Sequence, residues 1–220
     1  MAAKTKEVSK QEIVSHYMNT CLEHEVVPKS VFKFCSQLGI EDSQFYKYFG
    51  SLDILAKEVW LAFHENTMKA LEGDQQYEGY NRRSKLLAYY FSFFELITLN
   101  RSYVLFSLKN QQGIKSLQSL SELSKLRAAF LNFATTLIEA GNEEKKFSFT
   151  KHNTQIFSEA AWAQFLFILK FNLEDDSPGF EKTDVAIEKS INTVFDVFDY
   201  TPLENVIDLG KFLAKELFAK

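Results

Sequence analysis

The stretch from Pro28 to Trp60, PKSVFKFCSQLGIEDSQFYKYFGSLDILAKEVW, decides the fold of this chain. Apolar residues recur three and four positions apart over residues 30–38, which predicts a short amphipathic helix. Gly39 can adopt a positive φ and end that helix sharply, and a second short helix begins at Glu41 or Asp42. Two short helices joined in this way indicate a helix-turn-helix, whose second helix can enter the major groove of DNA.

The aromatic run after this turn resembles the hallmark of the tetracycline-repressor (TetR) family of bacterial transcription regulators. The chain matches the family pattern at Gly39, Ile40, Phe45, Tyr46, Tyr48, Phe49, Ser51, Asp53 and Leu55. It departs at Leu52, where the family usually has lysine, and the resemblance covers about residues 8–60. The resemblance implies an all-α fold, with an N-terminal three-helix helix-turn-helix domain and a larger C-terminal helical domain for ligand binding and dimerisation.

The composition also favours a helical protein. With 3 Pro and 8 Gly against 46% hydrophobic residues, the 220-residue chain has few breaks and room for long helices. The sequence has no apolar run of about 18 residues, and its start, MAAKTKEVSKQEI, lacks an apolar signal segment. We therefore expect a cytoplasmic protein without a membrane span, in which Cys21 and Cys35 are reduced and buried.

The polar segment over residues 73–79, which has a glycine at each end, is the best candidate boundary between two predicted domains. Residues 1–50 form the helix-turn-helix domain, in which Pro28 occupies the first position of the second helix. A helix over 51–72, capped by Ser51, links it to a helical effector-binding and dimerisation domain over 73–220. A helix over 115–140 should stop before Gly141 and Asn142. Further helices are expected over 81–98, 102–110, 153–172, 183–198 and 203–218.

The electrostatic signal for DNA binding is weak. The first sixty residues hold seven lysines, eight acidic residues and no arginine, so their net charge is −1, in a chain of net charge −4. Neutralisation of phosphates usually dominates affinity for DNA. Glu41 and Asp42 lie at the start of the recognition helix, where carboxylates repel phosphates unless one accepts a hydrogen bond from cytosine. They can also cap the helix and complement its dipole.

The family resemblance implies a recognition helix over about residues 42–48. Gln44 is chemically suited to an adenine edge, and Ser43 to several base edges. Three lysines and two tyrosine hydroxyls nearby can contact phosphates, although simple solvation is an equal alternative for the lysines. The residues predicted to contact DNA are Lys29, Lys33, Ser43, Gln44, Tyr46, Lys47 and Tyr48.

Aromatic residues in the second half of the chain can fill a core or border a cavity. The chain has 22 Phe, and many recur at helical spacing. The sequence leaves both alternatives open, with Arg101, Arg127 or Gln164 as possible polar anchors for a ligand. The resemblance implies an effector cavity for a small apolar ligand. The residues predicted to line it are Tyr90, Phe94, Tyr103, Phe130, Phe133, Trp162 and Phe165.

The segments over 153–172 and 183–198 predict a dimer contact. The first is apolar almost all round, so it must be covered on more than one side. Two antiparallel helices of this kind can form a symmetric four-helix interface with a second copy. The resemblance also implies a homodimer, because the last long helices usually form the dimer in this family.

Motifs for catalysis and metal binding are absent from the sequence. It contains no GxGxxG, P-loop, HExxH or GxSxG motif, and none of its four histidines is followed by a metal-ligating partner three or four positions later. We predict no enzymatic activity, no catalytic residue, no bound metal and no cofactor.

The leading hypothesis is a TetR-like transcriptional regulator that binds a double-stranded DNA operator as a homodimer. A small apolar ligand would release the operator by stabilising a spacing of the two recognition helices that does not fit DNA. The alternative is a lipid- or small-molecule-binding protein that keeps the fold without binding DNA. The acidic Glu41–Asp42 pair and the many phenylalanines favour the alternative, whereas the aromatic string favours the regulator.

Overall fold

The computed structural model describes residues 7–109, 121–143 and 151–200, and all regular secondary structure in these ranges is helical. The predicted all-α fold class is therefore confirmed. Contacts group the chain into two compact units, which we describe separately. Unit 1 comprises Met1–Lys69 and Phe93–Ala129, and unit 2 comprises Ala70–Ser92 and Phe130–Lys220. The predicted division at residue 73 stays a prediction, since these units group residues 93–129 with the N-terminal part of the chain.

The first helix, α1 (Lys10–His24), begins with a reciprocal cap. The Glu12 amide donates to the Ser9 hydroxyl oxygen (3.2 Å), and the Ser9 amide donates to the Glu12 carboxylate (2.8 Å). Ile13, Tyr17 and Cys21 recur four positions apart and are fully buried, so one stripe of α1 forms part of the core of unit 1.

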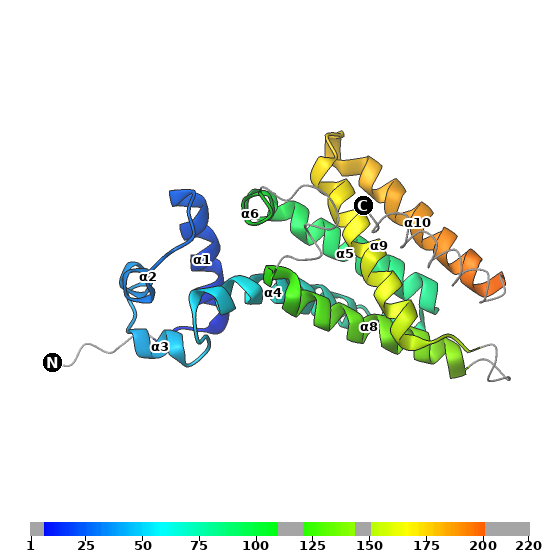
Figure 1. Ribbon diagram of the computed structural model, residues 1–220, viewed down its shortest axis with the longest axis horizontal. Coiled ribbons are helices and arrows are strands. Elements are labelled where there is room, and N and C mark those ends of the chain that lie inside the picture. The colour runs from blue at the N-terminus through cyan, green and yellow to red at the C-terminus, as the bar shows by residue number, and fades with distance from the viewer. Residues whose placement is uncertain (1–6, 110–120, 144–150, 201–220) are drawn as a thin grey trace, which may run out of the picture. The chain divides into compact units, whose positions relative to one another are not determined.

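The helix-turn-helix comprises α2 (Val31–Leu38) and α3 (Asp42–Tyr46), joined by a tight turn (Figure 1). Gly39 has a φ of 74°, and its amide donates to the Ser36 carbonyl (3.2 Å), as expected for a glycine that ends a helix. The prediction that Pro28 starts α2 is wrong. Ser30 caps this helix instead, because its hydroxyl accepts a hydrogen bond from the Lys33 amide (3.3 Å).

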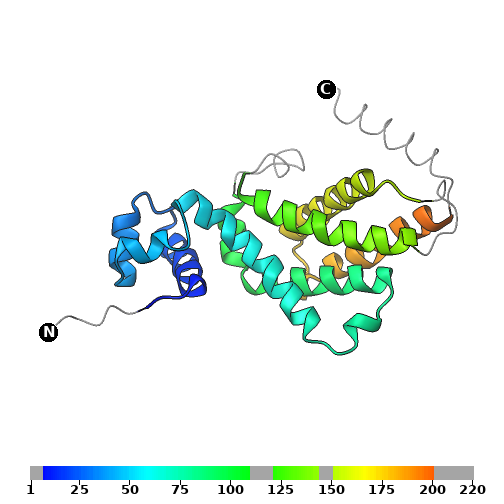
Figure 2. The same cartoon turned by 90° about the horizontal axis from the view of Figure 1, so that it is seen from below.

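Aromatic rings hold the helix-turn-helix together. Phe34 lies between Tyr17 and Phe45, with ring centroids 6.2 Å and 6.0 Å away, both in edge-on geometry. Phe45 also contacts Phe49 at 5.6 Å, and both side chains are buried. Figure 2 shows α1 beside the α2–α3 pair from a second direction.

The next helices are α4 (Leu52–Glu72), α5 (Arg82–Leu99), α6 (Arg101–Ser107) and α8 (Ser124–Glu143), with short 3₁₀ turns η1 (Tyr77–Gly79) and η2 (Ser121–Leu123). Ser51 caps α4 as predicted, since its hydroxyl accepts from the Ile54 amide (3.2 Å). The prediction that the helix before Gly141 stops there is wrong. The helix continues to Glu143, and the side chain of Asn142 pairs with the backbone of His152 through two hydrogen bonds of 2.7 and 2.9 Å.

A buried carboxylate joins three helices of unit 1. Glu58 on α4 forms ion pairs with Lys10 of α1 (2.6 Å) and with Lys125 of α8. Burial alone would raise the pKa of Glu58, but the two lysines outweigh burial and lower this pKa below its usual value. The N-terminal turn of α8 is thereby tied to the first helix of the helix-turn-helix domain.

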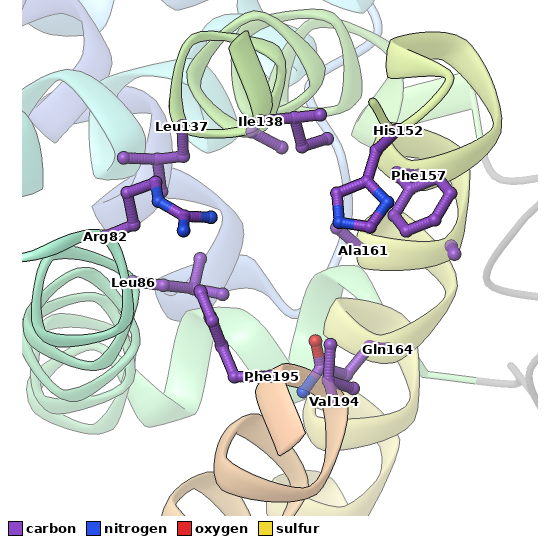
Figure 3. A pocket seen from close by; sticks show the side chains of 12 residues that line it. Arg82, Leu86, Leu137, Ile138, His152, Phe157, Ala161, Gln164, Val194 and Phe195 are labelled. Carbon is purple, nitrogen blue, oxygen red and sulfur yellow. The ribbon is translucent and has the colours of Figure 1, made fainter. Parts of the chain in front are cut away.

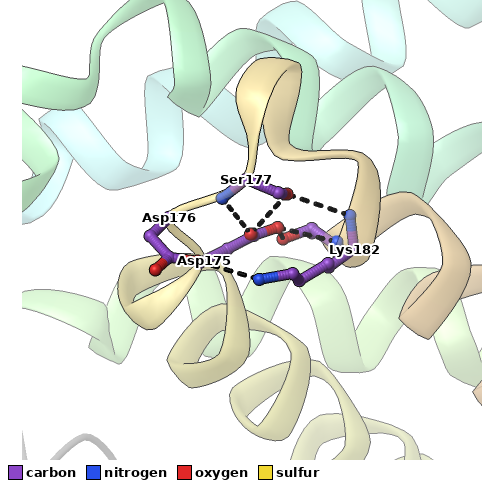
Figure 4. A network of polar contacts seen from close by, with 5 residues as sticks. Asp175, Asp176, Ser177 and Lys182 are labelled. Atoms are coloured by element: carbon purple, nitrogen blue, oxygen red, sulfur yellow. Dashed lines mark hydrogen bonds and ion pairs between the residues drawn. The ribbon is translucent and has the colours of Figure 1, made fainter.

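The long helices α9 (Thr154–Glu174) and α10 (Glu181–Tyr200) pack against each other (Figure 1). Their connection, which includes η4 (Pro178–Phe180), is organised by Asp175. The Asp175 carboxylate accepts hydrogen bonds from the amides and hydroxyls of Ser177 and Thr183, over 2.6–2.9 Å. Nearby, Lys182 forms an ion pair with Asp176 (2.9 Å; Figure 4). The first backbone amides of a helix have no carbonyl acceptor within the helix, and Asp175 provides one for the Thr183 amide of α10.

The core of unit 2 is a packed cluster of aromatic rings. Phe130 on α8 lies 4.9 Å from Phe165 and 5.7 Å from Trp162, and those two α9 rings are stacked at 5.2 Å. Tyr90 on α5 contacts Phe165 at 5.7 Å, and the Tyr90 hydroxyl donates to the Ala161 carbonyl (3.5 Å). The rings therefore fill the space between α5, α8 and α9.

No helix in the described part of the chain is long and apolar enough to cross a membrane. Within the same residues, no cluster of three or more His, Cys, Asp or Glu is arranged to hold a metal ion. The helix predicted over 203–218 lies outside the described residues.

Candidate DNA-binding surface and effector cavity

Helix α3, the predicted recognition helix, has one outward face. Ser43, Tyr46 and Lys47 are exposed at positions i, i+3 and i+4, and Tyr46 is 54% exposed. Lys29 and Lys33, at the start of α2, are also exposed. Five of the seven residues predicted to contact DNA are therefore exposed, and both helices present a lysine or hydroxyl group to solvent.

The other two predicted DNA contacts face inward or are already engaged. Gln44 is only 8% exposed, because helical periodicity places it beside buried Phe45 on the inner face of α3. The Tyr48 hydroxyl donates a hydrogen bond to the Val8 carbonyl (3.2 Å), so in this structure it fixes the segment before α1. The sequence-based assignment treated neighbouring positions alike, without applying the 3.6-residue period to so short a helix.

The sequence-based list of surface residues on the helix-turn-helix does not include one exposed aromatic residue, Phe32. Phe32 on α2 is 70% exposed, whereas Phe34 on the same helix is fully buried. The signal was present in the sequence, because Phe32 lies off the stripe defined by Val31, Phe34, Cys35 and Leu38.

The two acids at the start of α3 have different surroundings. Asp42 interacts with the Cys35 thiol; burial, together with the Asp42 carboxylate, raises the pKa of that thiol to about 11. The thiol is therefore protonated at neutral pH and can donate to Asp42. Glu41 is the N-cap residue and is exposed, with no capping hydrogen bond from its side chain. Glu41 is thus the more exposed acid of this pair, while Asp42 is half-buried.

The seven aromatic residues predicted to line a cavity are packed in the structure. Five of them, including Phe133, which contacts Tyr89 at 4.6 Å, belong to the ring cluster of unit 2. Phe94 and Tyr103 belong to unit 1, where Tyr103 contacts Tyr17 at 6.4 Å. None of the seven lines the cavity described next, because ring-to-ring contacts occupy the space around them.

An apolar cavity of about 140 Å³ lies within unit 2 (Figure 3). Its apolar walls come from all four long helices of the unit, and include Leu86, Leu137, Ile138, Phe157, Ala161 and Val194. Its polar groups are Arg82, His152 and Gln164, of which Gln164 was predicted as an anchor. The Gln164 amide donates to the Ser190 hydroxyl (3.0 Å), which orients it between α9 and α10. None of the described residues that line the cavity is acidic.

The outer face of α9 carries an apolar stripe. Ile156, Ala160, Ala163 and Phe167 are exposed at spacings of four, three and four residues, so they share one face of the helix. Ile156 and Phe167 are each 48% exposed. Trp162 and Phe165, on the opposite face, are buried in the core of unit 2.

Comparisons with known proteins agree with this architecture. Among solved structures, the chain is similar to the fatty acid degradation regulator FadR from Bacillus halodurans, at 14% identity and a TM-score of 0.58, over 84% of this chain and 95% of that one. It is also similar to a protein described as a TetR-family transcription regulator from Shewanella sp. PV-4, at 15% identity and a TM-score of 0.53, over 86% and 95% of the two chains.

The comparison with curated proteins gave no match. The family model described as "Tetracyclin repressor-like, C-terminal domain" matches residues 85–213, which is more than half of the chain and includes α8, α9 and α10. Together with the helix-turn-helix geometry around Gly39, this match makes the chain a member of the TetR family of transcriptional regulators.

Proposed function

We propose that the protein binds operator DNA through the outward face of its helix-turn-helix. The observation that carries this proposal is the shared exposure of Ser43, Tyr46 and Lys47 on α3, with Lys29 and Lys33 on the neighbouring helix. The α3 residues would contact base edges and the lysines would contact phosphates. The interaction of half-buried Asp42 with the buried Cys35 thiol supports the proposal, since Glu41 is then the more exposed acid at the helix start.

A second copy of the chain would provide the second recognition helix. The apolar stripe on α9, which includes Ile156 and Phe167, supports a homodimer through α9 and α10. A symmetric dimer of this kind would read two half-sites of a palindromic operator.

The cavity in unit 2 would hold a small apolar effector, and α8 would transmit its effect. Leu137 and Ile138 of α8 line the cavity, while Lys125 of the same helix pairs with Glu58. A ligand that shifts α8 would therefore act on α1 through the bond from Glu58 to Lys10. In energetic terms, the ligand must bind the DNA-incompetent arrangement more tightly than the competent one.

The alternative function is a lipid- or small-molecule-binding protein that does not bind DNA. The net charge of −1 over the first sixty residues and the exposure of Glu41 favour this alternative. It would keep the cavity and the dimer but lose the role of the α3 face.

DNA binding is tested by fluorescence anisotropy of the purified full chain with duplexes tiled across its own upstream DNA and with scrambled duplexes. We expect one or more tiles to bind more tightly than the scrambled controls. Lys47→Ala should weaken this binding several-fold, while Lys69→Ala, which removes an exposed lysine at the far end of α4, should not. A folded protein that prefers no tile at low salt would support the alternative function.

The dimer is tested by light scattering coupled to size-exclusion chromatography. Ile156→Glu and Phe167→Glu should shift the protein toward monomer, because each places a charge in the apolar stripe. Leu99→Glu is the matched control, since Leu99 is 78% exposed and lies away from α9 and α10 in the sequence. Equal effects of all three changes would contradict an interface on α9.

A further inference from the structure

We propose that the natural ligand of the unit 2 cavity is a small apolar carboxylic acid, whose carboxylate is bound by Arg82. This inference rests on the proposed effector role of the cavity and adds the chemical class of the ligand. The two are tested separately below.

The size of the cavity limits the apolar part of the ligand. Its volume of about 140 Å³ is close to that of an engineered apolar cavity that holds one benzene molecule, roughly 150 Å³. The aliphatic side chains of Leu86, Leu137 and Ile138 face Phe157 and Ala161 across this space, as Figure 3 shows. A ring or a chain of about six carbons would therefore fill it.

The charge at the cavity favours an anion. Arg82 is the permanently charged group among the described lining residues, and none of the others carries a carboxylate. Arg82 is also the first residue of α5, where the positive end of the helix dipole adds to its charge. A guanidinium can bind both oxygens of one carboxylate, so the class of ligand follows from the residue type and its apolar surroundings.

A glycine positions the guanidinium. A Cβ atom at position 141 would overlap the guanidinium of Arg82. The Arg82 side chain can occupy its observed position because residue 141 is a glycine, which has no side chain. Gly141 is buried within α8, where glycine is unfavourable for the helix. The next residue, Asn142, holds the backbone of His152 through two hydrogen bonds, and the His152 ring forms a second polar wall of the cavity.

The test compares benzoate with benzyl alcohol, its neutral analogue of similar size, by calorimetric titration of the full chain at neutral pH without DNA. We expect benzoate to bind about tenfold more tightly than benzyl alcohol, as one charge-assisted pair predicts. In Arg82→Gln this ratio should fall to about one. In Lys85→Gln, which removes a positive charge from the same helix outside the cavity, the ratio should be kept.

Gly141→Ala tests whether the position of the Arg82 guanidinium matters, because it moves this group without removing its charge and without unfolding the protein. This change favours the helix by about 1 kcal/mol, so the variant should remain folded, yet it displaces Arg82 and should lower the preference for benzoate. Equal binding of benzoate and benzyl alcohol to the wild type would overturn the inference, as would a preference that survives Arg82→Gln.

These outcomes are distinct from failure of the proposed function. Loss of the benzoate preference with intact DNA binding overturns the ligand class alone. Tight binding of benzoate by a protein that prefers none of its upstream duplexes supports the ligand class and overturns the proposed operator binding.

Discussion

The helix-turn-helix and the aromatic core of unit 2 are both helical and rich in phenylalanine, yet they are specified in different ways. In the helix-turn-helix, single residues fix single features: Ser9 and Ser30 start helices, and Gly39 ends one. In unit 2, the rings of Phe130, Trp162 and Phe165 fill the core collectively through mutual contacts. The first region depends on local backbone chemistry, and the second on volume.

The largest expected effect comes from emptying the ring cluster. Phe130→Ala should lower the free energy of unfolding by about 3–5 kcal/mol, because a fully buried ring is lost and a cavity remains. Phe91→Ala, on the exposed side of α5, is the matched control and should change stability by less than about 1 kcal/mol. Urea unfolding followed by circular dichroism measures both. Similar losses would show that the cluster is loosely packed.

The next effect concerns Asp175, a single residue of unit 2 that fixes a local feature, the connection between α9 and α10. Asp175→Asn should lower the free energy of unfolding by about 2 kcal/mol, since buried amides and hydroxyls lose a charged acceptor. Asp176→Asn should have little effect, because that side chain is 88% exposed. Equal losses for the two variants, measured by thermal unfolding, would contradict this assignment.

The same residue makes stability depend on pH. Burial alone would raise the pKa of Asp175, but hydrogen bonds from Ser177 and Thr183 outweigh burial and lower it well below its usual range. Because the folded pKa lies below the unfolded value of about 3.9, the stabilisation is complete above that pH. It is lost as pH falls below about 3.9 toward the folded pKa. The stability difference between wild type and Asp175→Asn should therefore shrink in acid.

A smaller effect is expected in the helix-turn-helix. Gly39→Ala should lower stability by about 1–2 kcal/mol, because alanine is strained at a positive φ. Its Cβ would meet no atom within 4 Å, so the effect isolates backbone strain. Gly50→Ala has equal space and no positive φ, and it should be neutral or slightly stabilising. Chemical unfolding of the two variants gives the comparison; a loss at Gly50 as large as that at Gly39 would contradict it.

The smallest expected change is in affinity rather than stability. Glu41→Gln should strengthen operator binding several-fold at low salt, because it removes an exposed carboxylate at the start of α3. Glu65→Gln, an equivalent exposed charge on α4, should leave affinity unchanged. Anisotropy titrations at two salt concentrations distinguish the variants. Weaker binding by Glu41→Gln would indicate that this acid accepts a hydrogen bond from a base.

The contrast between the two regions also explains which features could be predicted from sequence. Gly39 and Ser51 were assigned correctly, because residues that end or cap a helix carry local signals. Pro28 was misassigned because proline is favourable at a helix start and the sequence offers two candidates, Pro28 and Ser30. Ser30 provides the actual capping hydrogen bond.

Features that depend on tertiary packing were harder to predict. The inward position of Gln44 depends on the rotation of a helix of five residues, which is too short to show a period. The site of the cavity depends on how rings from α5, α8 and α9 pack, and the sequence does not distinguish a filled volume from an empty one. The close approach of the Arg82 guanidinium to Gly141 depends on packing between residues 59 positions apart, so neither residue alone predicts it.

The most direct test of the central proposal is the salt dependence of operator binding. We would compare wild type with a Lys29→Ala, Lys33→Ala, Lys47→Ala variant, and plot the logarithm of the association constant against that of salt concentration. The proposal predicts specific binding whose slope becomes shallower by about 5 in the variant, since three phosphate contacts are lost from each subunit of a dimer. Specific binding with an unchanged slope, or no specific binding by the wild type, would contradict the proposal that this face reads DNA.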